Sequence, residues 1–205
     1  MLLRILLLLL LSATALTVRA ELKAVDIYSD EELLQLIRQN TYLQRVKQDD
    51  CQIVKDIEAH ASVLQEPLYQ ILWGEMLNYG VCVAAQPSRG VEWLRRAAEQ
   101  GSPEAMLKLA EYYEQGKFLM KDPERAVYYV FPAASEGNLA AQMKLVKLLG
   151  EGYGTPRDYV LAYHWLYNQT FADTKTQRQS EKLLAKLAQL MPASQLERAK
   201  AVQLH

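Results

Sequence analysis

The sequence is poor in the residue types that build metal centres and active sites. It holds two cysteines and three histidines among 205 residues. The histidines, His60, His164 and His205, lie in separate segments and share no ligand-type spacing. No Ser/His/Asp arrangement is visible, and the glycines do not form a phosphate-binding loop. These absences give no support for an enzyme, a cofactor or a bound metal.

An excess of charge of either sign is also lacking. The chain carries 23 basic and 24 acidic side chains, for a formal net charge of −1. No basic stripe interrupts this balance, so nucleic acid is not expected as a partner. The one long apolar run lies within residues 1–20, and no membrane span is expected after it.

Residues 1–20 have the features of a cleavable secretory signal. Arg4 supplies the positive start, residues 5–11 form a short apolar core, and Val18-Arg19-Ala20 is a suitable cleavage site. The core is short for a membrane span, and an uncleaved anchor is the alternative. We therefore expect export and a mature chain that starts at Glu21. Without residues 1–20, 21 basic and 24 acidic side chains remain, a net charge of −3.

A regular repeat of 36 residues dominates the rest of the chain. Gly80, Gly116 and Gly152 lie 36 residues apart, and Gly101 and Gly137 are separated by the same interval. A fixed period of this length is typical of stacked repeats, in which each unit covers the apolar face of its neighbour. In register, the three units are residues 66–101, 102–137 and 138–173.

Two antiparallel helices are expected in each unit. Apolar positions recur in each half at spacings of three and four, which places them on one helical face. The glycines at the 36-residue interval suit helix ends, because glycine adopts a left-handed conformation without a Cβ clash. Ser102 before Pro103, and Asp122 before Pro123, are typical helix starts. Pro132 falls inside a predicted helix and is expected to kink it.

The unit resembles the Sel1-like repeat, a relative of the TPR motif. The resemblance rests on residues 93–101, which read Trp-Leu-Arg-Arg-Ala-Ala-Glu-Gln-Gly, and on Ala105, Leu109, Tyr113 and Gly116. It implies an all-α solenoid of helix-turn-helix repeats. Solenoids present broad surfaces to other proteins, so partner binding is the expected activity.

An N-terminal extension, residues 21–65, is expected to be helical. Ser29 and Glu32 have the spacing of a capping box before an apolar stripe. A second stripe follows, and its helix is expected to restart with Asp49 or Asp50 as cap. Because its apolar residues lie on one side, the extension is suited to cover the first repeat or to bind another protein.

Residues 174–205 are expected to form a C-terminal helical cap. Leucines at helical spacing predict a helix up to Met191, which Pro192 ends before a last short helix. The basic side chains of this cap are expected to form a solvated face, and partner binding is the alternative.

The two cysteines, Cys51 and Cys82, are expected to form a disulfide. An even number of cysteines in an exported chain favours pairing. The bond would close a loop of about 30 residues and stabilise the fold by roughly 3–4 kcal/mol in the chain-entropy model. It would link the extension to the first repeat, whose free face needs a cap. A reactive thiol or a metal pair is the alternative, although neither cysteine has a Cys-x-x-Cys partner or a nearby histidine.

A narrower resemblance covers nearly all of the mature chain. It is carried by residues 27–33 (Ile-Tyr-Ser-Asp-Glu-Glu-Leu), residues 42–47 (Tyr-Leu-Gln-Arg-Val-Lys), the motifs around both cysteines, and residues 191–193 (Met-Pro-Ala). In these motifs, and in the order of extension, repeats and tail, the chain resembles the MotX family, whose members are components of sodium-driven polar flagellar motors.

The MotX resemblance implies a structural protein of the periplasm without catalytic activity. It implies association with MotY and other T-ring subunits around the basal body, and recruitment and anchoring of the PomA/PomB stator, chiefly through PomB. As a hypothesis, the extension contacts MotY, and the repeats or the tail face the stator. The candidate partner-binding residues are Tyr28, Tyr42, Arg45 and Lys47.

Two other functions are kept as alternatives. One is a general periplasmic Sel1-like scaffold for protein interactions outside motility. The other is a secreted Sel1-like enzyme that binds or hydrolyses β-lactams. Proteins of that second kind carry a cysteine pair in nearly every repeat, whereas this chain has one pair in total.

Overall fold

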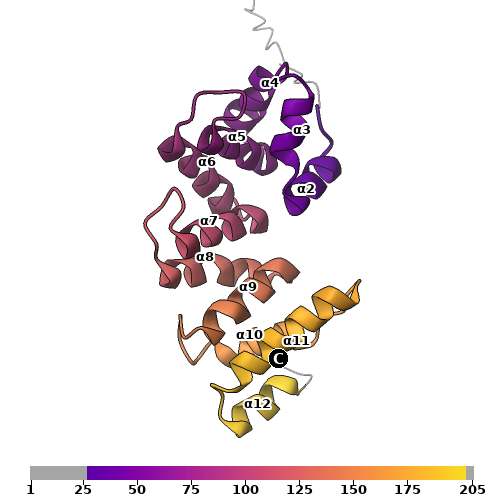
Figure 1. Cartoon of the computed structure of the whole chain (residues 1–205), viewed down its shortest axis with the longest axis vertical. Coiled ribbons are helices and arrows are strands. Elements are labelled where there is room, and N and C mark those ends of the chain that lie inside the picture. Colours follow the sequence, from indigo (N-terminus) through magenta and orange to yellow (C-terminus); the bar gives the residue numbers. More distant parts are fainter. Residues whose placement is uncertain (1–26, 202–205) are drawn as a thin grey trace, which may run out of the picture.

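The computed structural model describes residues 27–201, and within them all regular secondary structure is helical (Figure 1). The chain passes from a group of short N-terminal helices through three helix pairs to two C-terminal helices. These groups follow one another along the longest axis of the molecule. The all-α solenoid expected from the repeat is confirmed. The predicted signal, its cleavage site and His205 lie outside the described residues.

The N-terminal extension consists of short helices that lie beside the first repeat. They are α2 (Asp30–Gln39), α3 (Tyr42–Gln48), α4 (Val54–Ala59) and a π-helical turn, His60–Leu64. Ser29 caps α2, because its Oγ accepts a hydrogen bond from the Glu32 backbone N–H at 3.2 Å. The expected cap for the restarted helix is wrong: α4 follows Ile53, with no side-chain cap. Asp49 ends α3 instead, and Asp50 takes a left-handed backbone conformation, with φ of 52°.

Three helix pairs form the body of the molecule, and two further helices close its C-terminal end. The pairs are α5 (Pro67–Tyr79) with α6 (Pro87–Glu99), α7 (Pro103–Gln115) with α8 (Pro123–Ser135), and α9 (Leu139–Gly150) with α10 (Tyr159–Tyr167). The closing helices are α11 (Thr174–Ala188) and α12 (Ala193–Lys200). Ser102 and Asp122 cap their helices as expected. Pro132 lies inside α8, which continues past it to Ser135.

Each repeat turns through two left-handed positions. Gly80 and Gly116 follow α5 and α7 directly, with φ of 67° and 74°, while α9 ends one residue earlier, so that Glu151 separates it from Gly152. Two residues after these glycines, Cys82, Phe118 and Gly154 also have positive φ. A side chain at such a position costs roughly 1–2 kcal/mol. Phe118 offsets this cost through edge-to-face contacts with Tyr79 and Tyr112, both at 5.1 Å between ring centroids.

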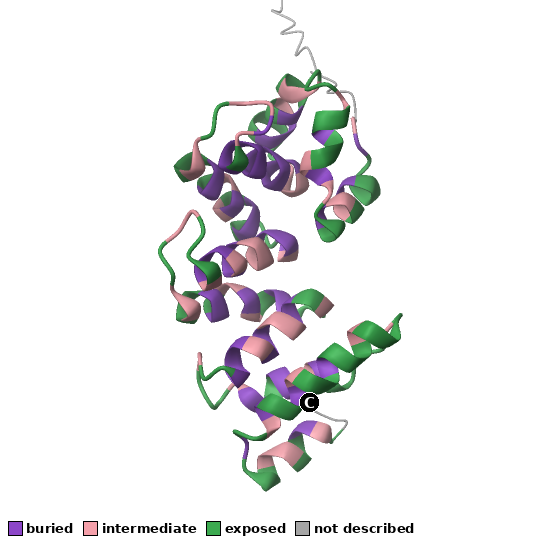
Figure 2. Cartoon of the chain, in the orientation of Figure 1, coloured by how far each residue is buried: buried purple, intermediate pink, exposed green. Residues whose placement is uncertain are grey.

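The hydrophobic core is continuous from the extension to the tail. One set of buried side chains joins the extension to the first two repeats, and another joins the second and third repeats to α11 and α12. Met106, Leu119 and Tyr129 pack against both sets. Figure 2 shows this buried layer between the helices, with exposed residues on the outer turns. None of the helices in residues 27–201 is both long and apolar enough to cross a membrane.

Candidate functional site

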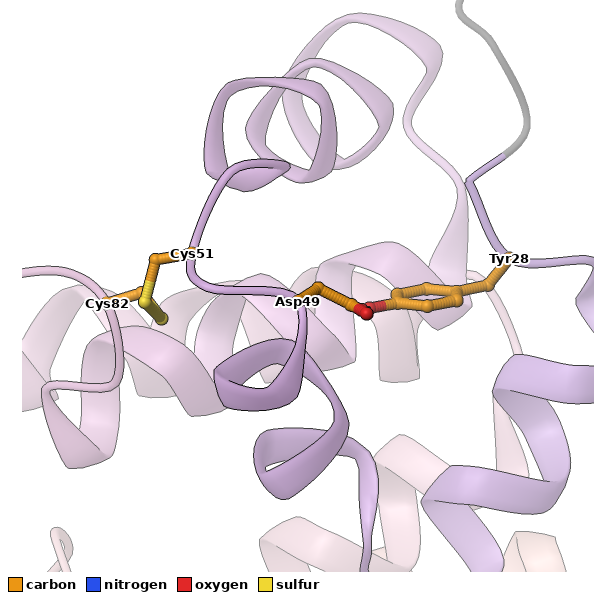
Figure 3. Close-up of a disulfide and its surroundings, with 4 residues drawn as sticks. All are labelled: Tyr28, Asp49, Cys51 and Cys82. Atoms are coloured by element: carbon orange, nitrogen blue, oxygen red, sulfur yellow. A yellow bond between two sulfur atoms is a disulfide. The ribbon is translucent and has the colours of Figure 1, made fainter.

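A disulfide fixes the extension on the first repeat. Cys51 and Cys82 are bonded, with their Cα atoms 5.5 Å apart (Figure 3). Cys51 lies between α3 and α4, and Cys82 lies in the turn after α5. The expected pairing is therefore present. Because both cysteines are used in it, the structure gives no support to a free reactive thiol or a cysteine metal site.

Tyr28 fastens the start of the extension. Its backbone N–H donates to the Tyr69 hydroxyl at 3.1 Å, and that hydroxyl donates to the Tyr28 carbonyl at 3.0 Å. The Tyr28 hydroxyl in turn donates to Asp49 Oδ2 at 2.5 Å. Figure 3 shows this contact beside the disulfide. Burial, and then the Asp49 carboxylate, raise the pKa of Tyr28, so its hydroxyl keeps the proton that it donates.

Glu75 is a buried junction between the extension and the first two repeats. This α5 side chain is fully buried. Its carboxylate accepts hydrogen bonds from Tyr42 of α3 at 2.6 Å, from Tyr112 of α7 at 2.5 Å and from Asn78 at 3.0 Å. Burial, followed by the nearby Glu75 charge, raises the pKa values of Tyr42 and Tyr112. Both phenols therefore remain donors, and three helices are held at one point.

The structure divides the four predicted partner-binding residues into two groups. Tyr28 and Tyr42 are only 3% and 2% exposed, and their hydroxyls are used inside the protein. The prediction that these two tyrosines contact a partner is therefore wrong, because their side chains hold the extension in place. Arg45 and Lys47 are exposed on α3. Arg45 forms an ion pair with Asp49 at 3.4 Å, and both cations remain candidates for partner contact.

A groove of about 630 Å³ lies where the extension, the repeats and the tail meet. We call it the inner groove. In Figure 1, α2 and α11 lie on the same side of the stack formed by α7 and α9. The inner groove is lined by Ile37 and Arg38 of α2, by Asn40, by Glu104, Leu107, Lys108 and Glu111 of α7, by Gly137, Asn138, Leu139, Ala140 and Met143 at the start of α9, and by Thr176 of α11.

Polar contacts hold α2 at the edge of the inner groove. Arg38 donates to Glu104 Oε1 of α7 through Nε at 3.1 Å and Nη2 at 3.0 Å. The Arg38 side chain is 52% exposed, whereas that of Glu104 is 9% exposed. Lys108 donates to Asn40 Oδ1 at 3.0 Å. The Arg38 guanidinium therefore covers the Glu104 carboxylate. The position of α2, which forms one wall of the inner groove, depends on contacts between residues 66 or more positions apart in sequence.

A second surface, the outer patch, gathers aromatic and cationic side chains of the first two repeats. It is a hollow of about 660 Å³ whose lining includes Arg95, Tyr113, Arg125, Tyr128 and Tyr129. Tyr129 stacks on Tyr113, and Tyr128 is 74% exposed. Burial raises the pKa of Tyr113, but hydrogen bonds from Arg95 and Arg125 outweigh it and lower the pKa overall. Tyrosine and arginine are enriched at binding hot spots.

Sequence reasoning missed the acids that organise these contacts. Glu75 is the single charged residue in the apolar run 68–77, and this isolation was a usable signal of a buried partner. Glu104 had no comparable signal, because an acid in the first turn of a helix is ordinary. Among residues 27–201, no group of three or more His, Cys, Asp and Glu side chains could hold a metal ion.

Comparison with known proteins places this arrangement in a family. The Sel1 repeat model matches residues 67–102, 103–138 and 139–167. A solved protective antigen of uropathogenic Escherichia coli with an SLR fold aligns with a TM-score of 0.56 at 25% identity, over 72% of this chain and 31% of the antigen. A Sel1 repeat protein from Oxalobacter formigenes aligns with a TM-score of 0.50 at 24% identity, over 76% of this chain and 56% of that one.

A full-length relative gives the narrower assignment. The sodium-type polar flagellar protein MotX of Vibrio parahaemolyticus serotype O3:K6 (strain RIMD 2210633) is 44% identical over 198 residues. The alignment covers 95% of this chain and 93% of the relative, so it includes the extension, the repeats and the tail. The chain therefore belongs to the MotX family of polar flagellar motor proteins with Sel1 repeats.

Proposed function

We propose that this protein is a non-enzymatic structural component of a sodium-driven polar flagellar motor, exported to the periplasm and built into the T ring. The observation that carries the proposal is the alignment with a sodium-type polar flagellar protein over nearly the whole of both chains. The disulfide supports a location outside the cytoplasm, because thiols inside the cytoplasm are kept reduced.

The proposed partners are MotY, other T-ring subunits and the PomA/PomB stator, bound chiefly through PomB. A motor anchor must keep its binding surfaces in fixed relation under load. The disulfide, the Glu75 junction and the continuous core supply that rigidity here. In this proposal the exposed cations Arg45 and Lys47 of α3 face MotY, and the repeats or the tail face the stator.

A deletion strain tests the proposed role in motility. Cells of a polarly flagellated host that lack this chain should still assemble a polar filament, but the filament should not rotate. Plasmid-borne wild-type chain should restore swimming. Normal swimming in the deletion strain, or absence of the filament, would favour a general periplasmic scaffold instead.

Charge reversal tests the proposed MotY surface. Arg45→Glu combined with Lys47→Glu should lower recovery of MotY with the tagged chain and leave recovery of PomB unchanged, since the two exposed cations face MotY in this proposal. Arg89→Glu combined with Arg157→Glu makes the same change of charge at exposed sites elsewhere and is the control. Loss of PomB with retention of MotY would contradict the assignment.

A further inference from the structure

We propose that the inner groove binds an extended segment of a motor partner in which a carboxylate lies next to apolar side chains. The inference rests on the proposed function, which supplies motor proteins as partners. It adds the site of binding and the chemistry of the bound segment.

The composition of the inner groove suits a short stretch of polypeptide. Leu107, Leu139 and Met143 line it and remain only partly buried, so they offer an apolar floor. Ala140 is exposed and has a small side chain, which leaves room for a backbone to approach. A volume of about 630 Å³ falls within the range of specific ligand sites. Because Ala140 leaves room for a backbone, we take the bound segment to be extended rather than helical.

The polar wall of the inner groove presents N–H donors to solvent. Arg38 donates two N–H groups, on Nε and Nη2, to Glu104 Oε1. A guanidinium carries further N–H donors, and these stay available to a bound group. Asn138 Nδ2 makes only a long contact to the same oxygen, at 3.5 Å. Lys108 adds a second positive charge, although its own donors are used by Asn40 and Glu111. A carboxylate is the complement of such a wall, because charge-assisted hydrogen bonds to arginine and lysine are strong.

The two acids that line the inner groove do not remove its preference for a carboxylate, because both are already paired. Glu111 is paired with Lys108, at 3.8 Å between Nζ and Oε2. Glu104 is already covered by Arg38. The donors that remain belong to Arg38 and Asn138, and they lie beside the apolar floor. A neutral apolar segment would leave these donors unpaired on binding, which is unfavourable.

Two substitutions at one exposed position separate charge from bulk. Ala140 is the second residue of α9, where an acid is favourable to the helix N-terminus, so Ala140→Glu should not unfold the protein. Ala140→Lys places a side chain of similar length and opposite charge in the inner groove. Recovery of the bound motor partner with the tagged full-length chain should fall at least about tenfold for Ala140→Glu and change less than about twofold for Ala140→Lys.

An exposed serine supplies the control, and a cross-link identifies the segment. Ser88→Glu puts the same charge on the second residue of α6, far from the inner groove in sequence, and should leave recovery unchanged. A photo-reactive amino acid at position 140 should cross-link a partner peptide that contains Asp or Glu. Equal losses from both Ala140 variants, a cross-linked peptide without an acid, or no loss from Ala140→Glu would each overturn the inference. If the unaltered chain recovers no motor protein, the proposed function itself fails.

Discussion

Glu75 places a carboxylate where apolar residues would otherwise be expected. A buried acid is costly unless hydrogen bonds replace its hydration. Here the hydroxyls of Tyr42 and Tyr112 and the Asn78 amide provide that replacement. Because the donors come from α3, α5 and α7, the extension must dock for the acid to be satisfied. A single residue therefore makes the docking of the extension and the folding of two repeats interdependent.

Glu75→Gln is expected to lower the free energy of unfolding by about 1–3 kcal/mol. The substitution keeps the volume but turns one acceptor oxygen into an N–H₂ group that faces other donors. Urea unfolding followed by circular dichroism measures the change. Glu99→Gln, on the exposed side of α6, is the control and should shift stability by less than about 0.5 kcal/mol. Equal midpoints for the two variants would contradict the role given to Glu75.

Gly90→Ala is expected to destabilise the first helix pair by about 1–3 kcal/mol through overpacking. A Cβ at Gly90 would lie 2.4 Å from the Gly74 carbonyl oxygen and 2.2 Å from Asn78 Oδ1, so α5 and α6 would have to separate. Thermal unfolding of the variant measures this loss. Ser88→Ala, an exposed change in the same helix, should leave the melting temperature nearly unchanged. A melting temperature for Gly90→Ala equal to wild type would show that the helices adjust freely.

At the scale of elements, ion pairs supplement apolar packing between successive repeats. Glu114 of α7 bonds to Lys144 at 2.6 Å and also to Lys147, both on α9. Burial raises the pKa of Glu114, but these hydrogen bonds and charges outweigh it, and the pKa lies below its ordinary value of 4.5. The folded protein therefore favours the ionised form more than the unfolded chain does.

This lowered pKa predicts a loss of stability in acid. The contribution of Glu114 is present above its unfolded pKa and disappears as pH falls through the lower folded pKa. Glu114→Gln should cost about 1–3 kcal/mol at neutral pH and progressively less as the pH falls below about 4.5. Unfolding free energies of both proteins across this range test the prediction. Glu136→Gln, at an exposed acid, is the control, and a cost for Glu114→Gln that does not change with pH would contradict it.

Helix ends were predictable where a side chain or a glycine acts locally. Ser102 and Asp122 accept the backbone N–H groups expected of caps, and Gly80 and Gly116 end their helices. The start of α4 was not predictable in this way. Asp49, one of the two expected caps, instead accepts a hydrogen bond from the Tyr28 hydroxyl, a partner 21 residues away. The Asp49 side chain is therefore used in a tertiary hydrogen bond and not in a helix cap, which local sequence rules cannot predict.

At the scale of the whole molecule, the extension acts as a third layer on the repeats. It contacts α5 through Tyr42 and Tyr28, and α7 through Arg38. The disulfide adds a covalent link to the first turn. The inner groove exists because α2 and α11 border the repeats on one side. Loss of the extension should therefore remove a wall of the inner groove while the third repeat and the C-terminal helices remain folded.

Removal of the disulfide tests this layered arrangement. Cys51→Ser with Cys82→Ser should lower the free energy of unfolding by about 3–4 kcal/mol, because the unfolded chain regains the freedom of a closed loop. Limited proteolysis should then cut first between α3 and α4. Dithiothreitol should reproduce both effects in the wild type and have none in the double variant. Unchanged stability together with unchanged proteolysis would show that noncovalent contacts alone hold the extension.

The sequence by itself determined the repeat, the helix pairs and the partners of the disulfide. These follow from features that act at short range or by repetition: apolar spacing, caps, turn glycines and the presence of just two cysteines. Only the tertiary structure decided which side chains face inward on the extension. Tyr28 and Tyr42 had the composition of a binding surface but became buried donors, because Tyr69, Asp49 and Glu75 accept or donate hydrogen bonds across distant segments. The inner groove likewise required α2, α7, α9 and α11 to meet, and no local pattern encodes that meeting.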